Sequence, residues 1–204
     1  MPSERILRGM QPGSDNKPTA VAGLLLTHGA GGGADQHTLV ALEEGLGMPV
    51  RRVEFPYRRE GRRFPDRAPK LIGTVRAEAE AFASDLGATT DRLVLGGRSM
   101  GGRMCSMAVA EGLPAAGLVL LSYPLHPPGK PEKLRVEHFS GMDVPTLLVN
   151  GDRDPFGTPE EFAAHIGSIS GDVTVHWLEG QGHNPKPRVD AEIVAAVDSF
   201  LASL

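Results

Sequence analysis

The sequence predicts an α/β fold in which a doubly wound, mostly parallel sheet carries helices on both faces. Short apolar runs alternate along the chain with amphipathic segments, which is the pattern of parallel strands joined by helical crossovers. The 26 glycines and 17 prolines are spread along the chain, as the many tight turns of such a sheet require. With 204 residues, 40% of them apolar, the chain can bury one sizeable core. We therefore expect a single domain over residues 1–204.

Six segments are predicted to be strands. The first is continuously apolar, which is typical of a strand that is buried on both faces of a parallel sheet. Residues 1–20 are polar and contain a candidate for a short edge strand at residues 4–8. The six predicted strands lie at residues 21–26, 50–55, 93–95, 116–122, 144–149 and 173–178.

The segments between these runs are predicted to be helices. Asp35 is expected to cap the first helix through its side chain, and Gly47 is expected to end it. Leu39, Leu42 and Leu46 recur at a helical spacing and should form its buried face. The predicted helices lie at residues 35–45, 71–86, 103–110, 131–139, 159–166 and 189–201.

Composition excludes several classes of protein. A net charge of −4 gives no general attraction to nucleic acid or to an anionic membrane. No apolar run reaches the roughly 20 residues of a membrane-spanning helix. Cys105 is the only cysteine, and the N-terminus lacks the apolar core of a signal peptide. We expect a cytoplasmic protein that acts on a small molecule, with no nucleic-acid or membrane partner, and the sequence leaves a homodimer open.

A glycine-serine-glycine pattern follows the predicted strand at residues 93–95. Ser99 stands two residues after Gly97 and two before Gly101. A nucleophile elbow requires this order of strand, sharp turn and helix, because the strained turn leaves room only for very small residues at those two positions. Such an elbow exposes the Ser99 hydroxyl and points the amide of Met100 at a bound oxygen. Taken alone, the pattern also fits a glycine-rich turn with a solvated serine.

A serine nucleophile needs a base and an acid, and both types follow later strands. His183 lies in a glycine-lined loop after the last predicted strand, where a base is expected. Two candidate acids, Asp152 and Asp154, follow the strand that ends at residue 149. We favour Asp154, which is far enough around the turn to face the histidine, whereas Asp152 fits a role in bonding turn amides. The chain order Ser99, Asp154, His183 is the one expected for this fold.

The glycine-rich loop at residues 28–33 follows the first predicted strand. Its backbone amides could complete an oxyanion hole with Met100, with Ala30 as the best donor and Gly31 as the second. The alternative is a phosphate-binding loop. The loop lacks the Lys-Ser/Thr ending of a P-loop, and Tyr57 and the following arginine stand where a dinucleotide site needs an acidic residue.

Four further residues are candidates for substrate binding. Arg62 and Arg63 belong to a basic loop that leaves the carboxyl end of a strand, where they could bind an anionic group. The alternative is a solvated surface whose arginines pair with neighbouring carboxylates. His28 begins the glycine-rich loop, and His126 fits a pocket or a surface position equally well. Cys105 follows the elbow and is expected to be a buried core thiol.

Taken together, the elbow, the glycine-rich loop and the acid and histidine loops resemble the α/β-hydrolase superfamily, with a short core similar to dienelactone-hydrolase-like members. The resemblance covers about residues 20–204. A narrower resemblance is to the hydrolase-like family that includes the testis-expressed Tex30-type proteins and a subunit of a histone-acetylating complex. The segments that carry it are residues 55–57, 61–63, 96–103, 123–129 and 151–157.

The superfamily resemblance implies hydrolysis of an ester, thioester or related acyl bond, with Ser99, Asp154 and His183 as a triad. No metal or organic cofactor is expected. The chain departs from the superfamily in its reduced opening strands and in the absence of a large lid after the strand that ends at Ser122, which leaves the site open. The alternative function is a non-catalytic module that keeps the fold and binds a protein partner.

Overall fold

The structure, a computed structural model, describes residues 20–204, so the edge strand expected at residues 4–8 lies outside the described part. Its six strands form one sheet in the order β2-β1-β3-β4-β5-β6, and every neighbouring pair is parallel. The α/β fold with a parallel sheet is thereby confirmed. The strands are β1 (Gly23–Thr27), β2 (Val50–Val53), β3 (Leu93–Arg98), β4 (Gly117–Leu121), β5 (Thr146–Gly151) and β6 (Val173–Leu178).

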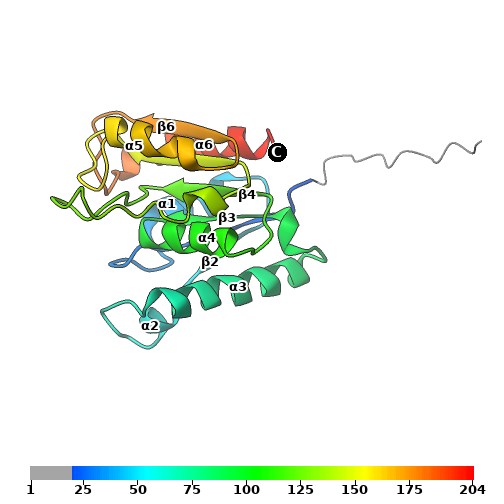
Figure 1. Ribbon diagram of the computed structural model, residues 1–204. Helices are drawn as coiled ribbons and strands as arrows, with labels where there is room; N and C mark the ends of the chain where they lie inside the picture. The colour runs from blue at the N-terminus through cyan, green and yellow to red at the C-terminus, as the bar shows by residue number, and fades with distance from the viewer. Residues whose placement is uncertain (1–19) are drawn as a thin grey trace, which may run out of the picture.

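Helices cover both faces of the sheet (Figure 1). The core beneath α3 and α4 is separate from the core beneath α1 and α6, and α5 adds Phe162 to the first of these. Each face is thus closed by helices that pack side by side. The helices are α1 (His37–Gly45), α2 (Pro56–Arg59), α3 (Ala68–Asp85), α4 (Met100–Ala110), α5 (Pro159–His165) and α6 (Asp190–Leu201).

The strands supply both cores by simple alternation. Leu25 and Leu95 pack toward α3 and α4, while their neighbours Leu24 and Val94 pack toward α1 and α6. All four side chains have no exposed surface. This two-sided burial explains why the central strands β1 and β4 are almost entirely apolar, whereas the edge strands β2 and β6 are partly exposed and carry polar side chains.

The strand order places a crevice between β1 and β3. The chain passes from β1 to β2 on one side, and β3 then pairs with the opposite side of β1. The connections that leave the carboxyl ends of β1 and β3 therefore diverge, and this is where open parallel sheets hold their ligands. The loop at residues 28–33 and the turn at Ser99 both begin at this point.

The start of α1 differs from the prediction. Gln36, not Asp35, is the N-cap residue, and no side chain accepts a hydrogen bond there. The predicted buried face is correct, since Leu39, Leu42 and Leu46 are all buried.

Residues 131–139 do not form the predicted helix, and only a short 3-10 turn, Phe139–Gly141, follows. The amide of Arg135 donates to the carbonyl of Leu125, and the Tyr123 hydroxyl donates to the carbonyl of Arg135, both at 2.8 Å. These nonlocal bonds use the backbone groups that a helix would need, so the segment runs as an extended connection instead.

A short helix, α2, forms where the sequence predicts only a loop. Pro56 occupies its first turn, where a missing amide hydrogen costs nothing. Within residues 20–204, no helix is both long enough and apolar enough to cross a membrane.

Candidate active site

Ser99 occupies the turn between β3 and α4. Its backbone angles, φ 53° and ψ −116°, lie in a region that residues with a side chain rarely adopt. The Ser99 amide donates to the Leu121 carbonyl at 2.8 Å, and the Arg103 amide donates to the Ser99 carbonyl at 3.1 Å. Bonds on both sides therefore hold the strained residue between a strand and the first turn of a helix.

The two glycines around Ser99 are required by the close approach of β1. A Cβ atom on Gly97 would lie 2.3 Å from the Thr27 carbonyl oxygen. A Cβ atom on Gly101 would lie 2.5 Å from the Thr27 Oγ1 atom and 2.6 Å from the His28 carbonyl oxygen. The absence of both side chains lets the turn pack directly against the end of β1.

The hydroxyl of Ser99 begins a continuous chain of hydrogen bonds. Ser99 Oγ lies 2.8 Å from His183 Nε2, and His183 Nδ1 lies 2.8 Å from Asp154 Oδ2. The second carboxylate oxygen, Oδ1, accepts a hydrogen bond from the Phe156 amide at 2.8 Å. Asp154 is only 1% exposed, so its carboxylate is held by these contacts in place of water.

The competing acid, Asp152, is not paired with His183. The Asp152 amide donates to the Leu178 carbonyl at 3.2 Å, which ties the residue to the end of β6. Its buried Oδ1 has no hydrogen-bond partner within residues 20–204. The structure therefore brings Asp154, and not Asp152, to the histidine.

Two neighbours fix the position of His183. The Phe156 ring stacks on the imidazole with a centroid distance of 3.9 Å and an interplanar angle of 25°. The Arg98 guanidinium donates to the His183 carbonyl and to the Asn184 side-chain oxygen. Burial lowers the pKa of Arg98, and the nearby Asp154 carboxylate opposes this shift. The sequence analysis missed Arg98, although its place at a strand end, directly before the candidate nucleophile Ser99, was a usable signal.

A cavity of about 640 Å³ opens over Ser99, and we call it the active-site cavity. This volume is within the range of small-molecule sites. Met100, Ala30 and Gly31, the residues predicted to form the oxyanion hole, all line it. Because Met100 is the first residue of α4, its amide has no acceptor within the helix. The Tyr57 hydroxyl donates to the Ala30 carbonyl at 2.9 Å and so holds the loop in place.

His28 is fully buried and does not line the cavity. The Phe55 amide donates to His28 Nε2 at 3.1 Å, and Nδ1 lies 2.8 Å from the Gly29 carbonyl oxygen. With Nε2 acting as an acceptor, the proton is on Nδ1 and the ring is neutral. Burial lowers the pKa of His28, which keeps the ring in that form. His28 thus joins the glycine-rich loop to the end of β2.

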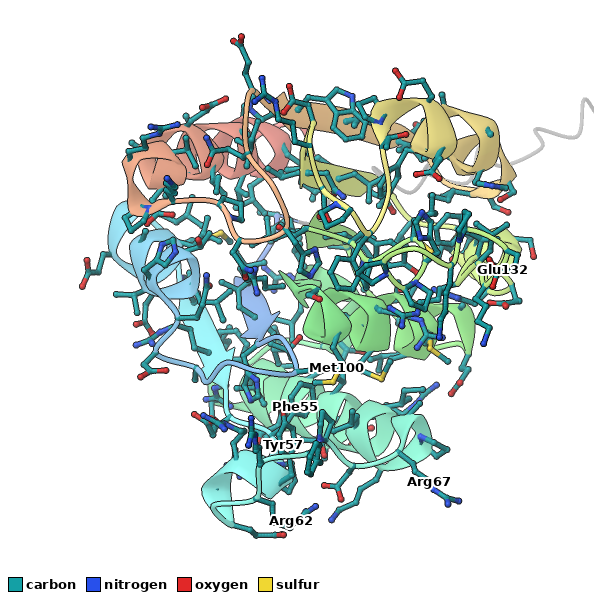
Figure 2. All side chains as sticks on the ribbon, turned by 90° about the vertical axis from the view of Figure 1, so that its left-hand side faces the viewer. Phe55, Tyr57, Arg62, Arg67, Met100 and Glu132 are labelled. Atoms are coloured by element: carbon teal, nitrogen blue, oxygen red, sulfur yellow. The ribbon has the colours of Figure 1, made fainter. Side chains whose placement is uncertain are left out.

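The other predicted substrate-binding residues also lie outside the cavity lining. Arg62 donates to Glu60 at 2.7 Å and to both oxygens of Asp66, and these bonds raise its pKa. Arg63 is exposed. Figure 2 shows Arg62 at the lower end of the view, far from Met100. For Arg62 the structure therefore has the alternative arrangement, a solvated surface with ion pairs.

His126 is buried and paired away from the cavity. Its Nδ1 lies 2.9 Å from the Pro127 carbonyl oxygen, and its Nε2 lies 3.2 Å from Glu161 Oε2. Glu161 is part of the capping box that begins α5. His126 therefore links the segment after β4 to α5.

Cys105 is a buried core thiol, as expected. Burial raises its pKa to about 12, so the reactive thiolate is absent near neutral pH.

Besides Arg98, two further arginines that the sequence analysis did not select line the active-site cavity, namely Arg103 and Arg135. Arg103 lies one helical turn after Ser99, and this spacing was visible in the sequence. Arg135 could not be found in that way, because nonlocal hydrogen bonds set the course of its segment.

An all-parallel sheet with a strained serine at the turn after β3, facing a histidine after β6, defines an α/β-hydrolase fold. The family described as an alpha/beta hydrolase domain matches residues 20–198. The chain belongs to this family.

Solved structures share the fold. Est1E from Butyrivibrio proteoclasticus aligns with a TM-score of 0.72 at 18% identity, covering 92% of this chain and 90% of that one. The RedJ thioesterase of the prodiginine biosynthetic pathway in Streptomyces coelicolor aligns with a TM-score of 0.67 at 20% identity, covering 89% of this chain and 91% of that one. An alpha-beta serine hydrolase homologue from Coxiella burnetii aligns with a TM-score of 0.69 at 17% identity, covering 93% of this chain and 88% of that one.

Proposed function

We propose that the protein is a serine hydrolase that cleaves an ester, thioester or similar acyl bond through an acyl-enzyme. The observation that carries the proposal is the pair of 2.8 Å contacts that join Ser99 to His183 and His183 to Asp154. The family and the presence of esterases and a thioesterase among its structural neighbours support the same reaction class. Within the family, we place the chain with the dienelactone-hydrolase-like and Tex30-type proteins that its motifs resemble.

Acylation begins when Ser99 Oγ attacks the carbonyl carbon of the substrate. His183 Nε2 takes the hydroxyl proton as the new carbon–oxygen bond forms, and Asp154 stabilises the resulting imidazolium through Nδ1. The carbonyl oxygen becomes an oxyanion, which we expect to accept hydrogen bonds from the amides of Met100 and Ala30. The tetrahedral intermediate then expels the alcohol or thiol, which leaves with the proton from His183.

Deacylation repeats these steps with water as the nucleophile. His183 takes a proton from the water as it attacks the acyl carbon, and Ser99 leaves with that proton when the ester bond to the enzyme breaks. No metal or organic cofactor is needed for either half of this reaction.

The alternative function is a non-catalytic module that binds a protein partner, and one experiment separates the two. The folded protein is treated with a fluorophosphonate probe, and the labelled residue is mapped by mass spectrometry. The serine hydrolase should be labelled at Ser99, and the Ser99→Ala variant should remain unlabelled. Turnover of para-nitrophenyl acetate should fall roughly 10³-fold or more in Ser99→Ala and in His183→Ala. Folded wild-type protein that neither reacts nor turns over the ester would support the binding module.

A further inference from the structure

We propose that Arg103 and Arg135 form a carboxylate-binding subsite in the active-site cavity, so that the preferred substrate carries a carboxylate close to its scissile acyl bond. The inference rests on the proposed function of Ser99. It also replaces Arg62 and Arg63, which lie outside the cavity lining, as the source of any selectivity for an anionic substrate.

The two arginines approach the cavity from different elements. Arg103 lies on α4, and its amide bonds to the Ser99 carbonyl, so its side chain starts one helical turn from the nucleophile. One turn corresponds to about 5.4 Å along the helix. Arg135 belongs to the connection between β4 and β5. An anion that contacts both arginines should therefore lie only a few bonds from the acyl carbon at Ser99.

The charged side chains that line the cavity are all basic. Arg98, Arg103 and Arg135 line it, and no aspartate or glutamate does. This contrasts with the net charge of −4 for the whole chain. Nothing in the lining neutralises the three guanidinium groups, so the cavity attracts anions.

Arg103 and Arg135 also lack a carboxylate partner among the described residues. Within residues 20–204, neither forms an ion pair with a carboxylate, whereas several other arginines do. Those paired arginines are Arg51, Arg52, Arg59, Arg62 and Arg76. The guanidinium groups of Arg103 and Arg135 are thus not neutralised by a carboxylate of the described residues and are available to a ligand.

In the described part of the chain, the two arginines lack an opposite charge, and Arg103 Nε also lacks a hydrogen-bond acceptor. Burial lowers the pKa of Arg135, and the charge of Arg103 lowers it further, so the two guanidinium groups destabilise each other. Arg103 Nε is buried and has no hydrogen-bond acceptor within residues 20–204. Buried donors normally have a partner. A carboxylate would supply both an acceptor and the missing negative charge.

The backbone around Arg135 is fixed before any ligand binds. Its amide and carbonyl each make a 2.8 Å hydrogen bond, to the Leu125 carbonyl and from the Tyr123 hydroxyl. The neighbouring His138 has a pKa lowered to about 4, mainly by burial, and is neutral near pH 7. The backbone that carries Arg135 therefore needs no ordering when an anion binds, which favours affinity.

Two matched pairs of esters test the subsite. On the acyl side, the mono-para-nitrophenyl ester of adipic acid carries a free carboxylate, and para-nitrophenyl hexanoate is its neutral counterpart. On the leaving-group side, para-acetoxybenzoate is compared with the neutral para-acetoxybenzamide. The wild-type protein should prefer the anionic member of at least one pair, and the pair that responds shows on which side the carboxylate lies.

Arg103→Gln and Arg135→Gln should each lower kcat/KM for the preferred anionic ester about ten- to hundredfold, mainly by raising KM. The neutral esters should change little. Arg188→Gln removes the same charge from an exposed position and should leave the preference intact. Added sodium chloride should reduce the wild-type preference toward that of the variants, because salt screens charge.

Equal effects of the two variants on anionic and neutral esters, or no wild-type preference in either pair, would overturn the subsite while leaving the hydrolase intact. Binding of adipate to the Ser99→Ala variant, measured by calorimetry, gives a readout that does not depend on turnover. If no ester is hydrolysed, the proposed function fails, and adipate binding still decides the subsite. Adipate binding that is lost when Arg103→Gln is added to the Ser99→Ala variant supports the subsite. If the Ser99→Ala variant does not bind adipate, the subsite is refuted.

Discussion

The guanidinium of Arg98, the residue directly before Ser99, donates hydrogen bonds to the carbonyl of His183 and to the side chain of Asn184. This contact joins the end of β3 to the loop after β6, two segments that are far apart in the chain. His183, the proposed base, is thereby held relative to the strand that leads to Ser99. Arg98 acts here as a positioning residue.

Replacing Arg98 with alanine should lower kcat for a neutral ester about tenfold or more and leave KM nearly unchanged, because a small displacement of the base weakens the reacting geometry. Steady-state kinetics with para-nitrophenyl acetate measure both constants. Asn184→Ala removes only one of the two acceptors and should have a smaller effect. A wild-type kcat in Arg98→Ala would show that the His183 loop holds its position without the guanidinium.

Asp154→Asn should lower kcat roughly 10³-fold, because the amide does not stabilise the imidazolium that forms on His183 and can favour the wrong tautomer. Asp152→Asn should have a much smaller effect, since Asp152 makes no contact with the histidine. The two substitutions make the same chemical change two residues apart, so each controls for the other. Comparing kcat for both variants checks the assignment, and the reverse ranking would transfer the role of acid to Asp152.

Gly101→Ala should destabilise the fold and reduce activity, because the added Cβ would lie 2.5 Å from Thr27 Oγ1 and 2.6 Å from the His28 carbonyl oxygen. Gly73→Ala is the matched control. Gly73 lies in α3 with no atom within 4 Å of its added Cβ, so alanine should stabilise the protein there by about 0.5–1 kcal/mol. Urea unfolding of the two variants measures this difference. A Gly101→Ala variant as stable as wild type would contradict the close packing of the elbow on β1.

The free energy of unfolding should decrease as the pH falls from about 6.5 toward 4 through His138. Its pKa is lowered from 6.5 to about 4 by burial and by Arg103, with Glu137 acting in the opposite direction. Between these values the unfolded chain binds a proton that the folded protein does not, so acid favours unfolding. In the folded protein, the Ser106 hydroxyl donates its proton to the Arg103 carbonyl. His138 Nε2, 2.8 Å from Ser106 Oγ, is therefore the donor in the bond between these two side chains.

The His138→Gln variant cannot titrate and should show a shallower decrease over the same pH range. His28, whose pKa is also lowered, contributes to both proteins and cancels in the comparison. Urea unfolding at several pH values gives the two slopes. Identical slopes would mean that the pKa of His138 is not lowered in the folded protein.

The sequence by itself determined the alternation of strands and helices, because strands buried on both faces must be continuously apolar. It also determined the local chemistry of the elbow, since only very small residues fit around a strained serine. Ser99, Asp154 and His183 could be selected because each follows a strand in an order typical of the fold. Such signals are local, and a local pattern is what a sequence displays directly.

Only the tertiary structure decided which side chains share the cavity. Arg62 forms ion pairs with Glu60 and Asp66 outside the cavity, whereas Arg103 and Arg135 line the cavity that opens over Ser99, from elements separated by β4. The course of the segment that carries Arg135 depends on hydrogen bonds to Leu125 and Tyr123, which compete with the helix that its own sequence favours. Side-chain position relative to a site depends on such nonlocal contacts, and these exist only once the chain has folded.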